Sequence, residues 1–546
     1  MALRKFLRNR PAGPVLRTLD VDTTQPRPRV TAQISAGILS TGIALAVGHA
    51  IAGLIAPGSS PFLAVADSVV DRAPAAVREA TIDALGTADK PALLISLAGI
   101  LAVLGVVVGL LERPRRPIGS LIIVALGLTG TLAAVTRPTA GPAWALPTLV
   151  GTVLAVVALR LMIGALFPAP ASPSGTADAE HPGPGPGPGP DRRRFLVLAG
   201  SAVAVIAAAG ATGVALTRRA ADALAERTGL QLPRVLSRNA APPVPEGIVP
   251  DAPGVTPFLT SNEDFYRIDT ALQVPKLTTG EWSLKIHGMV DNEVTLTWDD
   301  LMDMQAQERI ITLTCVSNEV GGNLAGTARW TGYPIKDILE RAGVQDDADM
   351  LFSTSVDGWT SGTPIDALTD GRDAMLVIGM NGEPLPLEHG YPVRQLVPGL
   401  YGFVSATKWV VDWEITRFDK AEAYWTKRDW GVKAPIKTAS RIDRPAGLSK
   451  LPVGDVVIAG TAWAQHRGIA KVEVRVDNGP WNTATLATEY SNDTWRQWFW
   501  TWQATPGQHT VYCRATDETG AVQPEERVAP IPDGATGWHN RVFRIE

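Results

Sequence analysis

The stretch RIITLTCVSNEVGG, residues 309–322, joins a β-branched run to a cysteine and a loop of small polar residues. Residues 309–314 are typical of a strand, and this strand leads directly into Cys315. The Ser, Asn and Gly residues that follow indicate a loop, which would place the thiol at the rim of a pocket beside backbone N–H groups. Taken alone, Cys315 fits better as a small apolar residue in a core.

Strands and helices are mixed irregularly on both sides of this stretch. Strands are expected over 282–287, 294–297 and 375–380, the last followed by an Asn381-Gly382 turn. Helices are expected after a capping box at 297–300, and from Pro334 to the residue before Gly343. Because no strict strand–helix–strand rhythm is present, the pattern predicts an α+β domain over residues 258–430.

Beyond residue 430 the sequence predicts strands only. They are expected over 456–462, 472–476, 495–502 and 510–515, with Gly-containing turn signals between them. Short strands at this spacing predict an immunoglobulin-like β-sandwich over residues 431–546. Cys513 falls in one of these strands and is expected to be a small buried apolar residue. A disulfide to Cys315 would require two separate domains to converge, and it is not expected.

The N-terminal part has a different composition. Five of its stretches, 31–66, 91–111, 117–136, 138–159 and 195–217, contain no charged residue, whereas fifteen of the sixteen tryptophans lie at or beyond Trp282. A membrane-spanning helix needs about 20 apolar residues. The sequence therefore predicts four spans within residues 30–166, namely 30–55, 91–111, 117–135 and 143–166, and a fifth over 195–216. The charged segment 62–85 is expected to be an amphipathic surface helix.

Basic residues indicate the orientation of these spans. They are concentrated in the tail 1–29, in the loop after the second span and in the linker 167–194. The positive-inside rule makes these segments cytoplasmic and places the linker 217–257 and all that follows outside. The chain is thus expected in the cell membrane, with the bilayer as a partner and its C-terminal half extracytoplasmic. The run Arg192–Arg194 resembles an internal twin-arginine export signal, an ordinary positive flank being the alternative.

Composition excludes several classes of function. The net charge of −4 gives no electrostatic support for a nucleic-acid partner. Two cysteines are too few for an iron–sulfur cluster or a four-thiolate zinc site, and the chain has no C-x-x-C-H haem motif. His49 is the single histidine in the predicted spans, whereas a haem between two histidines needs both. Neither haem nor an iron–sulfur cluster is therefore expected.

Three motifs together resemble the sulfite oxidase family of molybdopterin-dependent oxidoreductases, in its membrane-anchored bacterial form. Residues 312–318 with Gly321-Gly322 are similar to the molybdenum-binding segment, and 388–399 with Lys408-Trp409 to the pterin-phosphate segment. Residues 265–267 are similar to the first cofactor loop. The resemblance covers residues 258–546. It implies a molybdopterin-binding catalytic domain followed by a dimerisation-type sandwich, and hence a homodimer.

The resemblance also implies roles for individual residues. Cys315 would be the molybdenum ligand, since a soft thiolate suits a metal already held by dithiolene sulfurs. The implied cofactor contacts are Tyr266, Arg267, Asp357, His389, Arg394, Thr407 and Lys408, in which Arg and Lys meet the need of a phosphate. The implied catalytic residues are Cys315 and, around the substrate, Arg267, Asp429 and Trp430.

The implied activity is two-electron oxygen-atom transfer at a small sulfur compound, with electrons passing to a separate cytochrome or quinone-linked protein. Two departures bear on the substrate: Glu319 stands in a loop where the family has an anion-binding arginine, and Trp430 stands where it has a tyrosine. A reductase of sulfoxides, such as methionine sulfoxide, is therefore a second hypothesis. A cell-surface binding protein without cofactor is the hypothesis from another class.

Overall fold

The structure, a computed structural model, describes residues 27–546 except 75–76, 78–80, 82–83, 86–87, 138, 168–190, 218 and 253. Almost all of the predicted tail 1–29 and most of the predicted linker 167–194 therefore lie outside the described residues. The chain forms two compact units, which are considered separately. One comprises the residues up to Ala66 with 88–134 and 143–213, and the other comprises 67–87, 135–142 and 214–546.

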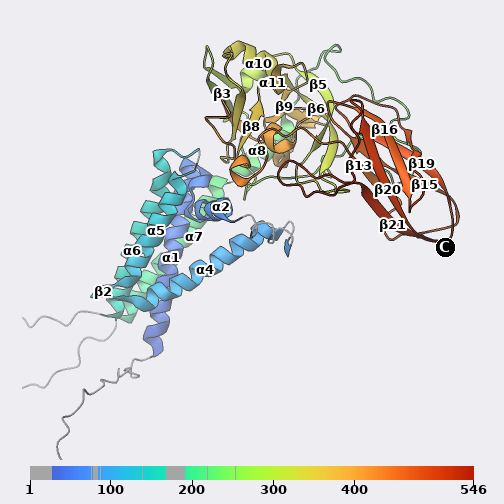
Figure 1. Cartoon of the computed structure of the whole chain (residues 1–546). Helices are drawn as coiled ribbons and strands as arrows, with labels where there is room; N and C mark the ends of the chain where they lie inside the picture. The colour runs from blue at the N-terminus through green and yellow to red at the C-terminus, as the bar shows by residue number, and fades with distance from the viewer. Residues whose placement is uncertain are drawn as a thin grey trace, which may run out of the picture. The chain divides into compact units, whose positions relative to one another are not determined.

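Among the described residues, five helices are long and apolar enough to cross a membrane (Figure 1). They are α1 (Arg27–Ile55), α4 (Asp89–Leu111), α5 (Ile118–Val135), α6 (Leu146–Leu166) and α7 (Arg192–Thr217). The prediction of five apolar helices is thus confirmed. α1 contacts both α4 and α6. A Cβ at Gly109 of α4 would overlap the carbonyl oxygen of Gln33 in α1, so small residues let these two backbones approach closely.

Short elements adjoin these helices. They are η1 (Pro57–Ser59), α2 (Pro61–Arg72), β1 (Glu112–Arg113), β2 (Arg116–Pro117), η3 (Pro142–Ala145) and α8 (Arg219–Gly229). The segment 62–85, predicted as one amphipathic helix, is helical over its first part as α2, which ends before Pro74. Several residues after Pro74 lie outside the described part of the chain.

Two sheets build the domain that follows residue 258. One has the strand order β10-β9-β6-β5, with β11 also paired to β9, and the other has the order β4-β3-β12-β7-β8. β12 runs parallel to β3 and antiparallel to β7. The strands are β3 (Ser283–Gly288), β4 (Val294–Thr297), β5 (Gln307–Thr314), β6 (Ala325–Pro334), β7 (Met350–Ser355), β8 (Thr360–Pro364), β9 (Met375–Met380), β10 (Glu383–Pro384), β11 (Arg394–Leu396) and β12 (Val410–Thr416).

Local sequence signals explain where the helices of this domain begin and end. The helices are α9 (Trp298–Met302), α10 (Ile335–Ala342), α11 (Asp366–Thr369), η4 (Leu387–His389), α12 (Gly402–Ser405) and η5 (Thr426–Arg428). The predicted capping box is present, because Thr297 and Asp300 each accept a hydrogen bond from the other's backbone N–H. α10 follows Pro334 and ends at Gly343, whose φ of +68° suits glycine.

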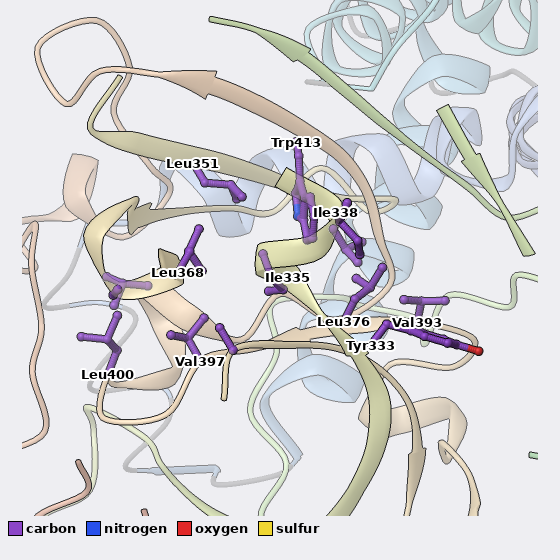
Figure 2. Close-up of a cluster of buried hydrophobic side chains, with 14 of the residues drawn as sticks. Tyr333, Ile335, Ile338, Leu351, Leu368, Leu376, Val393, Val397, Leu400 and Trp413 are labelled. Carbon is purple, nitrogen blue, oxygen red and sulfur yellow. The ribbon is translucent and has the colours of Figure 1, made fainter. Parts of the chain in front are cut away.

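Helix α10 fills the space between the two sheets (Figure 2). Its Ile335 and Ile338 are fully buried with Leu351 of β7, Trp413 of β12 and Leu376 of β9. Because β7 and β12 belong to one sheet and β9 to the other, this core holds the two sheets together. The mixture of sheets and helices predicted for residues 258–430 is therefore observed.

Two further sheets share one core in the C-terminal domain. Their strand orders are β13-β15-β19-β18 and β14-β21-β20-β16-β17. Val474 of β16, Cys513 of β20 and Trp498 of β19 are fully buried in the shared core, and both cysteines of the chain are free. The strands are β13 (Ala439–Arg444), β14 (Lys450–Leu451), β15 (Gly454–Trp463), β16 (Ile469–Val476), β17 (Asn482–Thr483), β18 (Thr485–Leu486), β19 (Arg496–Ala504), β20 (Gly507–Asp517) and β21 (His539–Ile545).

The C-terminal domain is hydrogen-bonded directly to β5. Gln465 Nε2 donates to Thr314 Oγ1 at 2.8 Å, and the Trp495 backbone N–H donates to Thr312 Oγ1 at 2.8 Å. Trp495 is itself buried in the core that α10 occupies. The strand that precedes Cys315 is therefore held from both sides, by β6 within its own sheet and by the C-terminal domain.

Replacing Ile338 by alanine should remove packing from both sheets at once. We expect a loss of about 2–5 kcal/mol of unfolding free energy, because the buried site cannot collapse around the smaller side chain. Denaturant unfolding of the full-length protein in detergent measures this loss. Lys336→Ala on the exposed face of the same helix is the control and should change stability by less than about 0.5 kcal/mol. Equal effects of the two substitutions would contradict the role assigned to Ile338.

Candidate active site

Cys315 opens onto a pocket formed by loops at the ends of several strands. β5 carries Cys315 at its end, the turn after β7 carries Asp357, and the loop before β12 carries Lys408. The residues that line the pocket are Phe265, Tyr266, Ile268, Asp269, Thr270, Leu313, Cys315, Val316, Ser317, Ser355, Asp357, Trp359, His389, Arg394, Gly402, Phe403, Ala406, Lys408, Trp409, Trp425 and Trp430. Segments distant in the sequence thus converge on one thiol.

The loop after Cys315 is closed by its own hydrogen bonds. The Cys315 N–H donates to Leu324 O at 2.9 Å, and the Leu324 N–H donates to Asn318 Oδ1 at 2.8 Å. Burial raises the pKa of the Cys315 thiol, and hydrogen bonds from Ser317 oppose this rise without cancelling it. Burial therefore disfavours the thiolate, and a bound metal ion would favour it.

The C-terminal domain supports the far end of this loop. Arg441 Nη1 donates to Gly322 O at 2.8 Å. Gly321 has a φ of +80°, and a Cβ there would overlap the ring of His539. Gly321 is thus required by its backbone conformation and by a close approach from the neighbouring domain, whereas a Cβ at Gly322 would lie 2.6 Å from Asn318 Oδ1 within the loop itself.

Arg394 is a buried cation at the pocket. It is 5% exposed, and burial lowers its pKa to about 10. Nη1 donates to His389 O at 3.1 Å, the guanidinium lies 5.3 Å from the centre of the Trp330 ring, and Nε has no hydrogen-bond partner. Among the described residues no carboxylate pairs with it. A buried guanidinium in this condition needs an anion, and the pocket is where one can enter.

Lys408 and Arg267 meet at Asp269. Lys408 Nζ donates to Asp269 Oδ2 and to Glu388 O, each at 3.0 Å, and Arg267 Nε donates to Asp269 Oδ2 at 2.8 Å. Burial lowers the pKa of Lys408 to about 8, with Asp269 acting in the opposite direction. Lys408 lines the pocket, whereas Arg267, with 42% of its side chain exposed, extends away from the lining.

His389 is neutral at physiological pH. Burial lowers its pKa to about 4, and the positive charges of Arg394 and Lys408 add to the effect. Its Nε2 lies 3.3 Å from Asn262 O, so Nε2 carries the proton and donates, which leaves Nδ1 as an acceptor. His389 can therefore bind a polar cofactor group without adding a further charge.

The structure brings most of the predicted site residues together. Cys315, Tyr266, Asp357, His389, Arg394, Lys408 and Trp430 line the pocket. Three predicted site residues do not line the pocket. Arg267 pairs with Asp269, Thr407 is fully buried with its hydroxyl 2.9 Å from Ser361 Oγ, and Asp429 is exposed at the end of η5.

Sequence patterns did not single out an aromatic and apolar wall of the pocket. Trp359, Trp425 and Phe403 line it together with Trp430. The ring centres of Trp425 and Trp430 are 6.0 Å apart, and those of Phe403 and Trp430 are 5.9 Å apart. The short spacing between Trp425 and Trp430 was the available signal. The approach of Phe403 and Trp359 arises from the tertiary fold.

Comparisons with known proteins agree with this geometry. Residues 271–425 match the family described as oxidoreductase molybdopterin binding domain, and residues 432–545 match the Mo-co oxidoreductase dimerisation domain. Mitochondrial sulfite oxidase of Rattus norvegicus is 28% identical over 325 residues, which cover 50% of this chain and 58% of that protein. The Homo sapiens enzyme is 29% identical over 343 residues, which cover 54% and 61%.

Two other proteins match this chain with lower sequence identity. The NADH nitrate reductase of Spinacia oleracea is 26% identical over 323 residues, covering 47% of this chain and 34% of that protein. The solved structure of the sulfane dehydrogenase SoxCD from Paracoccus pantotrophus aligns with a TM-score of 0.47 and 22% identity, covering 54% of this chain and 84% of that one. This chain spans less than two thirds of the length of the curated relatives named here.

Replacing Arg394 by methionine should prevent the pocket from holding an anionic cofactor. Methionine keeps much of the buried volume and removes the charge, so we expect the domain to fold and the molybdenum and pterin content to fall at least about tenfold. Metal analysis and pterin fluorescence of the purified protein measure this content. Arg417→Met, which removes a partly exposed arginine paired with Asp419, is the matched control. Full cofactor content in Arg394→Met would contradict the assignment.

Proposed function

We propose that this chain, which belongs to the sulfite oxidase family of molybdopterin-dependent oxidoreductases, transfers an oxygen atom to or from a small sulfur compound. The observation that carries the proposal is the buried Arg394, with its unpartnered Nε, in the same pocket as Cys315. Together they offer a cation for a phosphate and a soft ligand for a metal. When bound, the molybdopterin cofactor supplies the two-electron chemistry.

In this proposal the chain's own residues hold the cofactor and orient it toward the substrate. The Cys315 thiolate ligates the metal, and Arg394 and Lys408 hold the anionic part of the cofactor. His389 binds as a neutral group, so the site does not accumulate a third positive charge beside them. The walls of Trp359 and Trp425 exclude water from the place where the substrate reacts.

Pocket polarity favours an uncharged substrate. Glu319 is exposed and does not line the pocket, so no residue of that loop replaces the family's anion-binding arginine. The lining cations, Arg394 and Lys408, are assigned to the cofactor. Trp430 lines the pocket, and its buried Nε1, for which the described residues provide no hydrogen-bond partner, is the donor that we assign to the oxygen of a sulfoxide. Sulfoxide reduction is therefore our first proposal for the direction of the reaction, and sulfite oxidation, the activity named for the curated relatives, is the second.

A substrate screen tests this choice. We expect the metal-replete full-length protein in detergent to reduce methionine sulfoxide with a kcat/KM at least about tenfold above that for sulfite oxidation. Trp430→Phe should lower the sulfoxide value about fivefold, since one neutral hydrogen bond contributes about 1 kcal/mol. Trp481→Phe in the C-terminal domain is the control. A preference for sulfite would establish the second activity, and a wild-type protein without molybdenum or turnover would favour a binding protein.

We place this enzyme in the cell membrane, with residues after Leu216 on the extracytoplasmic side. The five apolar helices and the distribution of basic residues support this location. Residues 432–545 support a homodimer. Electrons would pass to a separate cytochrome or quinone-linked protein, because the sequence offers neither a C-x-x-C-H motif nor cysteines for a cluster.

Reporter fusions measure the proposed orientation. A reporter that is active only outside the cytoplasm should give a signal when fused after Arg238 and none when fused at Gly185. The reason is that the basic run Arg192–Arg194 keeps the N-terminal end of the fifth helix in the cytoplasm. Changing Arg192–Arg194 to lysines keeps the charge and removes the twin-arginine pattern. Normal export of a molybdenum-loaded domain by that variant would show that the run acts only through its charge.

A further inference from the structure

Two short segments between the apolar helices belong to the same compact unit as residues 214–546. They are residues 67–87 and 135–142. Arg137 joins the two segments: its Nη1 lies 2.7 Å from Asp71 Oδ2, and its Nη2 lies 3.6 Å from Asp67 Oδ2. The side chains are mostly buried, with 15% of Arg137 and 32% of Asp71 exposed, so solvent screens this pairing less than it screens a surface pair.

Asp71 also binds the loop that carries Trp425 and Trp430. Tyr424 Oη donates to Asp71 Oδ1 at 3.1 Å, and Arg428 Nη2 donates to the Asp71 carbonyl oxygen at 2.8 Å. The Arg428 guanidinium lies 3.6 Å from the centre of the Tyr424 ring, and its Nη1 donates to Tyr424 O at 2.7 Å. One aspartate therefore holds two residues of the loop, which also hold each other.

Arg137 makes a second connection to the pocket. Its Nη2 donates to the backbone carbonyl of Asp357 at 3.0 Å. Asp357 lies in the turn after β7 and lines the pocket. The guanidinium of Arg137 thus ties the turn at Asp357 to the loop held by Asp71.

The charges of the residues in this network are complementary. Asp71 pairs with the guanidinium groups of both Arg137 and Arg428, and Asp67 lies beside that of Arg137. Burial raises the pKa of Asp67 to about 6, Arg137 opposes the rise, and the carboxylates of Asp71 and Asp357 add to it. Arg137 therefore lies between two carboxylates, and Asp71 has both arginines as partners.

The loop held in this way forms one wall of the pocket. Trp425 packs edge-on against Tyr424 with ring centres 5.1 Å apart, and the Trp430 N–H donates to Trp425 O at 3.2 Å. Trp425 and Trp430 both line the pocket. Any displacement of Tyr424 or Arg428 would therefore move the aromatic wall.

We propose that Asp71 and Arg137 are positioning residues, which clamp the loop 424–430 and so shape the substrate pocket from a part of the chain that precedes the catalytic domain by more than a hundred residues. The inference rests on the proposed function only where it takes this pocket as the substrate site. On this view the N-terminal region contributes to the active site as well as to anchoring.

The test uses the full-length, molybdenum-loaded protein in detergent. Asp71→Asn, Arg137→Gln and their double variant are compared with Arg72→Gln, a control in the same helix whose guanidinium donates to Ser68 O. Hydrogen exchange of the amides of 424–430 reports on the clamp, and KM and kcat report on the pocket. We expect exchange to quicken about tenfold in both single variants, and KM to rise about 5- to 20-fold with kcat changed less than twofold.

Further variants distinguish a positioning role in the loop 424–430 from a general contribution to the stability of the domain. Since both residues act through one network, the double variant should be no worse than the poorer single variant by more than about twofold. Tyr424→Phe removes a single hydroxyl and serves if the other variants fold poorly; it should also quicken exchange in 424–430. Unchanged exchange there, or a uniform increase across residues 258–430, would overturn the proposal. If the wild-type protein turns over neither substrate, the proposed function fails while the exchange measurements still decide the clamp.

Discussion

The antiparallel pairing of β5 with β6 is the constraint on which the site depends. It fixes eight residue pairs from Gln307 to Thr314 and delivers Cys315 to the rim of the pocket. Bonds from Gln465 and Trp495 secure the same strand from the C-terminal domain, and Arg441 secures the loop that follows it. The position of Cys315 therefore results from two domains rather than from one loop.

Burial determines the electrostatics of the cationic side chains in the pocket. In the part of the chain that the structure describes, no carboxylate pairs with the buried Arg394, whereas Lys408 pairs with Asp269, and His389 is kept neutral by the same surroundings. Burying a cation costs free energy unless an anion compensates it. An anionic group bound at Arg394 would therefore offset part of the free-energy cost of burying this cation.

Local signals in the sequence predict the elements better than they predict the site. The capping box at Thr297 and the glycine after α10 act within a few residues, and both are found where the pattern indicates. The Cys315 strand and the pterin segment are recognisable as motifs. Trp359 lies in the turn between β7 and β8 and Phe403 lies in α12, and they carry no local signal because only the tertiary fold brings these elements together at the pocket. For the same reason no pattern links Asp71 to Tyr424.

The contact among Asp71, Arg137 and Tyr424 has a consequence for how such a chain can evolve. Two apolar helices, α4 and α5, separate Asp71 from Arg137, and two more, α6 and α7, separate Arg137 from Tyr424. In a bilayer each spanning helix carries the chain to the opposite face, so a pair of helices returns it to the face where it began. If the helices between these residues span a bilayer, as we propose, a gain or loss of helices there would preserve the contact only in even numbers. The contact among three polar side chains would thus restrict changes in the number of spanning helices in the N-terminal half to even numbers.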